Sequence, residues 1–88
     1  MEEVVEFVLG PEVTIKNVRQ VSDRISEILL AGRDLSIRAA DLESGDVTLV
    51  QILIAARKSA AERGCRVCVE DPSPALTALL RRCGLAAL

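Results

Sequence analysis

The segment 41–56 constrains the fold of this chain more than any other, because an acidic, glycine-containing turn runs directly into the most apolar stretch of the sequence. By composition alone, Val47–Ala56 could form either a strand or a helix. Strong helix formers continue the segment without a break as far as Arg63, so we predict a helix that ends at Gly64. The chain is therefore expected to display an acidic turn at the start of a long helix.

The start of this helix is the most promising functional position in the sequence. Asp46 precedes the helix and Thr48 lies in its first turn. Backbone N–H groups there have no partner inside the helix, and the helix dipole presents partial positive charge. A capping carboxylate, an anion or a phosphorylated side chain is stabilised at such a place. We therefore expect the rest of the chain to act as a scaffold for this turn.

Strands and helices alternate along the remaining sequence, with glycine and proline between them. Hydrophobic periodicity predicts strands at residues 4–9, 12–15, 34–40 and 65–70, a helix from Asn17 to Ala31-Gly32, and a last helix from Ser73 to Gly84. This order predicts a small α/β fold with a four-stranded, mostly parallel sheet and three to four helices. Polar residues on one face of several strands suggest that helices do not cover both faces of the sheet evenly.

Residues that commonly cap helices are present where the first and last helices start. Asn17 is followed three residues later by Gln20, as in a capping box. Ser73 suits an N-cap, and Pro74 after it suits the first helical position. At the other end of the last helix, Leu85 and Leu88 are expected to fold back onto the core.

Composition limits both the core and the partners. The 88 residues predict one domain, 1–88, and because Phe7 is the only aromatic residue, the core must consist of aliphatic side chains. The net charge of -2 comes from interspersed acids and bases, which disfavours nucleic acid as a partner. No apolar run reaches the roughly 18–20 residues that a bilayer requires, and the acidic N-terminus does not resemble a signal peptide. We expect a cytoplasmic protein without direct membrane insertion.

Catalysis, cofactors and bound metals are not expected. Histidine is absent, and the sequence contains no phosphate-binding loop and no nucleophile elbow. Cys65 and Cys68 have C-x-x-C spacing, but in a strand such residues point to opposite faces. We interpret these thiols and Cys83 as small core-filling residues rather than as a redox pair or a zinc site. Weak binding of Mg²⁺ by the acids of the turn is an alternative.

Three stretches of the chain, taken in order, resemble a STAS domain, the fold of bacterial anti-sigma-factor antagonists and of the tails of sulfate transporters. They are residues 35–41, residues 46–53, and residues 63–76 together with Cys83-Gly84-Leu85. The resemblance covers nearly the whole chain and rests on the order and spacing of the stretches. It implies the small STAS fold and a module without catalytic chemistry of its own.

The resemblance also implies roles for residues at the start of the long helix. In anti-sigma-factor antagonists, a serine after the aspartate is often phosphorylated by a kinase, and the unphosphorylated form binds the anti-sigma factor. Asp46 matches that aspartate, but Val47 occupies the phosphoacceptor position, which puts the usual switch in doubt. Thr48 matches the next hydroxyl position and is either an alternative acceptor or a residue that satisfies the first helical turn. Leu49 stands where the family often has glycine.

The predicted site lies at the carboxyl edge of the sheet, where loops after parallel strands gather. It combines acidic and hydroxyl residues with an apolar patch, and such a surface suits docking to a protein. Its residues are Asp41, Glu43, Ser44, Asp46, Val47, Thr48, Leu49 and Val50, with Glu70, Asp71 and Ser73 on the neighbouring loop and with Val47, Leu49 and Val50 forming the patch. The acids could also simply cap helices and stay solvated.

Two functions follow from the resemblance. The first is a protein-interaction module of bacterial signal transduction, in transcription regulation or chemotaxis, that binds an anti-sigma factor or a signalling kinase. The alternative is a small STAS subunit of a lipid-transport ABC complex, whose partner would be the ATPase subunit of the transporter. A homodimer is compatible with both functions.

Overall fold

The computed structural model describes residues 4–85, in which strands and helices follow the expected α/β order. The elements are β1 (Val4–Val8), β2 (Glu12–Val13), α1 (Val18–Leu30), β3 (Asp34–Arg38), β4 (Ser44–Gly45), α2 (Val47–Arg63), β5 (Val67–Glu70) and α3 (Pro74–Arg82). Within the described residues, three helices and parallel strands confirm the predicted fold class. Leu88, which was expected to fold back onto the core, lies outside the described residues.

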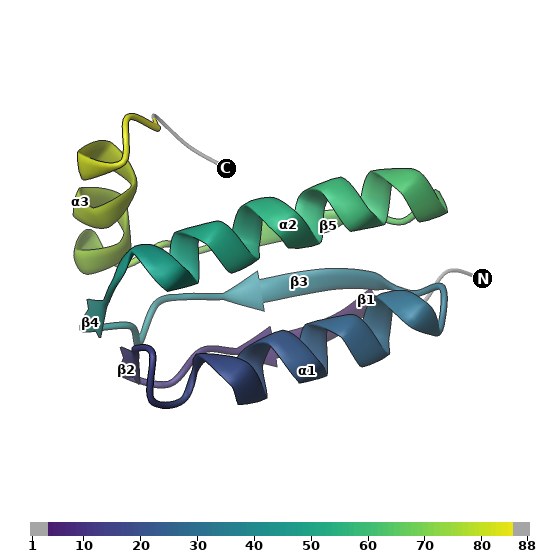
Figure 1. The fold of residues 1–88 in the computed structure, drawn as a ribbon, viewed down its shortest axis with the longest axis horizontal. Helices are drawn as coiled ribbons and strands as arrows, with labels where there is room; N and C mark the ends of the chain where they lie inside the picture. Colours follow the sequence, from purple (N-terminus) through teal and green to yellow (C-terminus); the bar gives the residue numbers. More distant parts are fainter. Residues whose placement is uncertain (1–3, 86–88) are drawn as a thin grey trace.

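The main sheet has three parallel strands in the order β1-β3-β5, with β3 at its centre (Figure 1). Its register places Ile37 between Phe7 and Val69. The expected fourth strand is not part of this sheet. Instead, β2 pairs with β4 in a separate parallel ladder of two short strands. The sequence therefore predicts the direction of the strands correctly but not how they divide between two sheets.

The predicted extension of β2 as far as Ile15 is wrong, because the chain turns at Thr14. The backbone N–H groups of Asn17 and Val18 both donate to the carbonyl oxygen of Thr14, at 3.0 and 2.8 Å. The side chain of Asn17 also serves this turn: its Oδ1 accepts from the Thr14 N–H and its Nδ2 donates to the Glu12 carbonyl oxygen, both at 2.8 Å.

The predicted capping box at α1 is consequently wrong as well. Asn17 does precede the helix, but its side chain makes no hydrogen bond to the first turn of α1. The amide is oriented toward the preceding turn instead, where both of its polar atoms bind backbone groups. The later helix starts follow the prediction: Asp46 caps α2 and Ser73 caps α3 through their side chains.

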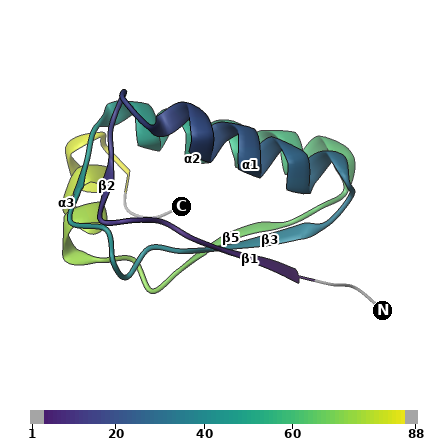
Figure 2. The ribbon, with the colours of Figure 1, turned by 90° about the horizontal axis from the view of Figure 1, so that it is seen from below.

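The helices α1 and α2 lie side by side on one face of the main sheet, and α3 stands across its carboxyl end (Figures 1 and 2). Alternate strand residues point to the helices and form the core with them; the largest fully buried side chains are Leu9, Val13, Leu35, Ile37, Leu42, Leu49, Leu53 and Leu76. The core is aliphatic, with Phe7 and Leu85 packed against it half-buried. No described helix covers the other face of the sheet, in agreement with the uneven cover that the polar strand residues predict.

The cysteines do not fill the core as predicted. Cys68 and Cys83 are exposed, and Cys65 is half-buried against the core cluster. Cys65 also lies outside β5, because its backbone N–H donates to the carbonyl oxygen of Ala60 at 2.8 Å and so closes the end of α2. All three thiols are free.

None of the helices in residues 4–85 combines the length and the hydropathy that crossing a bilayer requires.

The first prediction tests which face of α2 is buried. Leu53 is 1% exposed, whereas its neighbour Ile54 is 44% exposed. Leu53→Ala leaves a cavity in the core, so we expect the free energy of unfolding to fall by about 2–5 kcal/mol. Ile54→Ala is the matched control and should cost less than about 1 kcal/mol. Urea denaturation measures both, and equal losses would contradict this orientation of the helix.

Candidate functional site

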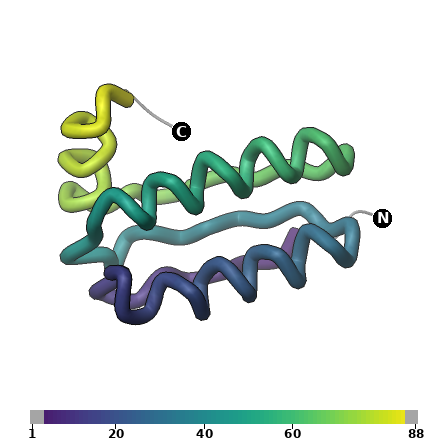
Figure 3. Tube along the Cα trace, in the orientation of Figure 1, coloured from purple at the N-terminus to yellow at the C-terminus, as the bar shows by residue number. Residues whose placement is uncertain are grey.

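The candidate site forms where β4 runs into α2, at the end of the molecule that also holds β2 and the start of α1 (Figure 3). The backbone N–H groups of Glu43 and Ser44 donate to the carbonyl oxygen of Pro11 at 2.7 and 3.0 Å. A Cβ on Gly45 would lie 3.2 Å from Leu49 Cδ2 and 3.4 Å from the carbonyl oxygen of Val13. A Cβ at position 45 would therefore require the Leu49 side chain to shift by a few tenths of an ångström.

The Asp46 carboxylate joins two chain segments at this end. Its Oδ1 accepts hydrogen bonds from the backbone N–H of Thr48, at 3.1 Å, and from the Thr48 hydroxyl. Its Oδ2 accepts from the backbone N–H of Ile15 at 3.3 Å. The carboxylate thus caps α2 and also holds the turn that precedes α1.

These contacts favour the ionised form of the carboxyl group. The hydrogen bond from the Thr48 hydroxyl is the largest cause that lowers the pKa of Asp46 below its ordinary value, and the backbone N–H groups of Thr48, Ile15 and Leu49 lower it further. Partial desolvation opposes them. The net direction is downward, so Asp46 carries its negative charge at neutral pH.

Ile15 belongs to this site although the sequence did not indicate it. Its side chain is 74% exposed, and that of Val47 is 53% exposed. The bond to Asp46 brings the backbone of Ile15 to the start of α2. The one available clue in the sequence is that Ile15 lies between two polar residues, Thr14 and Lys16. We refer to Ile15, Asp46, Val47 and Thr48 together as the α2 tip.

The predicted apolar patch is wrong in two of its three residues. Leu49 and Val50 are 0% and 2% exposed, and together with Leu53 they form the core-facing side of α2. Leu49, where STAS domains often have glycine, therefore fills the core instead of enlarging the loop. Only Val47 of this patch reaches the surface, and the second exposed apolar side chain of the tip is Ile15.

The other predicted residues divide into three groups. Asp41, Glu43 and Ser44 are exposed in the loop and the short strand before α2. Glu70 and Asp71 instead form ion pairs with Arg38. Ser73 is buried, and its Oγ accepts from the backbone N–H of Leu76 at 3.1 Å, so it caps α3 and is not part of a docking surface.

A metal site receives no support from the arrangement of the acids. Throughout residues 4–85, no three His, Cys, Asp or Glu side chains are grouped so that they could hold a metal ion. This includes Asp41, Glu43 and Asp46, the acids for which weak Mg²⁺ binding was the alternative. At Asp46, both carboxylate oxygens already accept hydrogen bonds from the protein.

A family model described as Mlab, STAS domain, matches residues 2–88. No curated protein and no solved structure matches the chain. The matched range contains every described element, from β1 to α3.

The second prediction concerns the charge of Asp46. In Asp46→Asn the amide cannot accept from the Ile15 N–H while its Oδ1 serves Thr48, and the favourable charge at the helix start is lost. We expect the variant to unfold a few degrees below the wild type at pH 7. Because the folded-state pKa lies below the ordinary value of 3.8, this stabilisation is present above that value and is lost as the pH falls through the folded-state pKa.

Thermal unfolding followed by circular dichroism between pH 7 and pH 2 measures this difference. Asp23→Asn, on the exposed side of α1, is the control and should change the unfolding temperature little. A gap between wild type and Asp46→Asn that stays constant down to the lowest pH would contradict the proposed role of the charge.

Proposed function

The chain belongs to the STAS domain family, and we propose that it is a non-catalytic module that binds a partner protein through the α2 tip. The observation that carries this proposal is the pair of exposed apolar side chains, Ile15 and Val47, on the residues that bond to or follow the ionised Asp46. Apolar side chains beside a fixed charge give both binding energy and orientation at a protein interface.

A contact between distant segments of the chain supports the same proposal. Ile15 and Asp46 lie 31 residues apart in the sequence, yet a hydrogen bond holds them together before any partner arrives. A surface that is already ordered loses less conformational entropy on binding. Asp41 and Glu43 add exposed negative charge in the preceding loop. A partner that fits this surface would offer an apolar pocket with a basic rim.

We propose further that binding at the tip is constitutive rather than switched. Val47 has no hydroxyl, so the usual phosphoacceptor position cannot be modified. Thr48 has one, but it donates to Asp46. A phosphate on Thr48 would add about −1.5 to −2 charge beside that carboxylate, replacing an attraction with repulsion. Thr48 remains the candidate phosphoacceptor of the tip, but its phosphorylation would break the hydrogen bond to Asp46 and place two negative groups side by side.

Two kinds of partner are compatible with such a surface. The first candidate is an anti-sigma factor or signalling kinase of bacterial signal transduction. The second is the ATPase subunit of a lipid-transport ABC complex, and the unmodifiable Val47 favours it, because a permanent subunit needs no phosphorylation switch. Purification of the tagged chain from its native cells, with identification of the stoichiometric partner, separates the two.

The third prediction tests the tip with the partner so identified. Val47→Asp and Ile15→Asp place a charge where apolar contact is proposed, so each should weaken binding at least about tenfold, as loss of an interface anchor does. Isothermal titration calorimetry measures the dissociation constants. Leu30→Asp is the matched control, because Leu30 is 67% exposed at the far end of α1.

An unchanged affinity for both tip variants, or a comparable loss with Leu30→Asp, would contradict the assignment of the interface. Circular dichroism of each variant ensures that the fold is retained.

The fourth prediction addresses the switch. After incubation with ATP and the co-purified proteins, the intact mass of the chain should be unchanged, and Thr48→Ala should bind the partner within about threefold of the wild type. Mass spectrometry and calorimetry provide the two measurements. A phosphate located on Thr48 that abolishes binding would overturn the constitutive mode while leaving the interface in place.

A further inference from the structure

The face of the main sheet that the described helices leave uncovered carries a second unusual surface (Figure 2). We call it the outer face. By strand alternation and register its residues are Val4, Glu6 and Val8 of β1, Asp34, Ser36 and Arg38 of β3, and Cys68 and Glu70 of β5. It is distinct from the α2 tip, which lies beyond the carboxyl end of the sheet.

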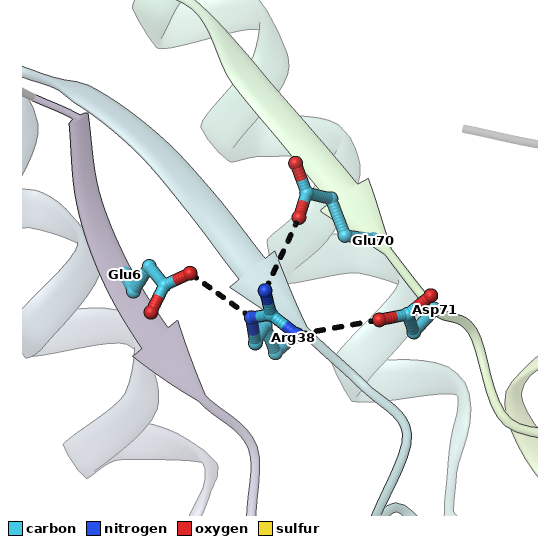
Figure 4. A network of polar contacts seen from close by, with 4 residues as sticks. All are labelled: Glu6, Arg38, Glu70 and Asp71. Carbon is cyan, nitrogen blue, oxygen red and sulfur yellow. Dashed lines mark hydrogen bonds and ion pairs between the residues drawn. The ribbon is translucent and has the colours of Figure 1, made fainter.

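Charge on the outer face is unbalanced around Arg38 (Figure 4). The guanidinium pairs with Glu6 at 3.0 Å through Nε, with Asp71 at 3.3 Å, and with Glu70 at 4.0 Å. Three carboxylates from β1, β5 and the loop after β5 thus share one cation. All four side chains are more than two-fifths exposed, so the excess negative charge faces solvent.

The outer face also contains a buried hydroxyl without a partner. Ser36 lies between Glu6 and Cys68 in the register and on the same face as Arg38. It is 5% exposed, and within the described residues its Oγ makes no hydrogen bond. Buried polar groups are nearly always paired in folded proteins, because an unpaired one costs free energy. Because the Oγ atom has less than 1 Å² of accessible surface, a bound group supplies this partner only when the neighbouring side chains shift to admit it.

Apolar side chains complete the surface at the edge strand. Val4 and Val8 are 58% and 54% exposed on β1, an edge strand of the main sheet. They lie on β1, on the same side of the strand as Glu6. Exposed apolar side chains next to an acidic group suit a ligand that is itself part apolar and part basic.

We propose that the outer face binds a basic, amphipathic segment of a partner protein, with lysine or arginine side chains at the carboxylates around Arg38 and apolar side chains over Val4 and Val8. The excess negative charge selects this occupant. A second copy of the chain packed face to face would bring two acidic groups together, and nucleic acid would be repelled. The proposal does not depend on the α2 tip.

The test uses the full chain and a capped peptide of alternating arginine and valine residues as the probe. In a titration followed by two-dimensional ¹H–¹⁵N NMR, we expect amide shifts in β1, β3 and β5, and an affinity that falls as salt is added. The same peptide with glutamate in place of arginine should produce no shifts.

Variants of the outer face test whether the peptide binds at the carboxylates around Arg38. Glu6→Gln with Asp71→Asn removes two of the three carboxylates, and the affinity for the peptide should fall at least about tenfold; Asn tolerates the positive φ of residue 71. Ser36→Ala should weaken binding about two- to fivefold without unfolding the chain, because its hydroxyl gains its partner only in the complex. Asp23→Asn with Glu27→Gln on α1 is the charge-matched control and should bind as the wild type does.

Three outcomes would overturn the proposal. Shifts that map to α1 or α2 would place the peptide elsewhere. Equal affinities of the Glu6→Gln/Asp71→Asn variant and the α1 control would show that the peptide responds to the net charge of the chain and not to the carboxylates around Arg38. A concentration-dependent dimer that shifts the same amides without peptide would make a second copy the occupant instead.

Discussion

The candidate site depends on the hydrogen bonds of one carboxylate, that of Asp46. They connect the turn before α1, at Ile15, with the first turn of α2, at Thr48. The β2–β4 ladder brings these two segments to the same end of the molecule, and Asp46 fixes them there with its charge retained. The proposal for the α2 tip depends on this link, because it brings the residue that carries the exposed Ile15 side chain to the charged start of α2, beside Val47.

The scaffold leaves two surfaces free for different reasons. At the carboxyl end of the sheet, the tip is exposed because α2 begins there with a polar cap. On the outer face, the strands are exposed because α1 and α2 both pack on the opposite side (Figure 2). The two proposed surfaces are therefore separate, and binding at one would leave the other accessible. In both places the chain offers negative charge beside valine or isoleucine, so partners with basic and apolar groups fit both.

The sequence predicts those features that are determined by neighbouring residues. The ends of α2 and the start of α3 follow from Asp46, Gly64 and Ser73, each of which acts on the backbone within a few residues. The side chain of Asn17 shows the limit of such reasoning, because the same residue type caps helices and fixes turns. In this chain Asn17 fixes the turn, because both polar atoms of its amide bind backbone groups that precede the helix.

Features that depend on distant contacts could not be predicted. The β2–β4 ladder joins pairs of residues far apart in the sequence, and neither strand is long enough to give a periodic signal. The apolar start of α2 gives no clear stripe, so the sequence alone could not show that Val47 faces solvent while Leu49 and Val50 are buried. The Arg38 cluster likewise requires the register of three strands.

Hydrogen exchange of the chain alone and in complex with its purified partner tests the central claim most directly. If the α2 tip is the interface, exchange should slow at residues 14–16 and 44–48 and stay unchanged at the far end of α1. Protection confined to other parts of the molecule, with no change at these two segments, would contradict the account.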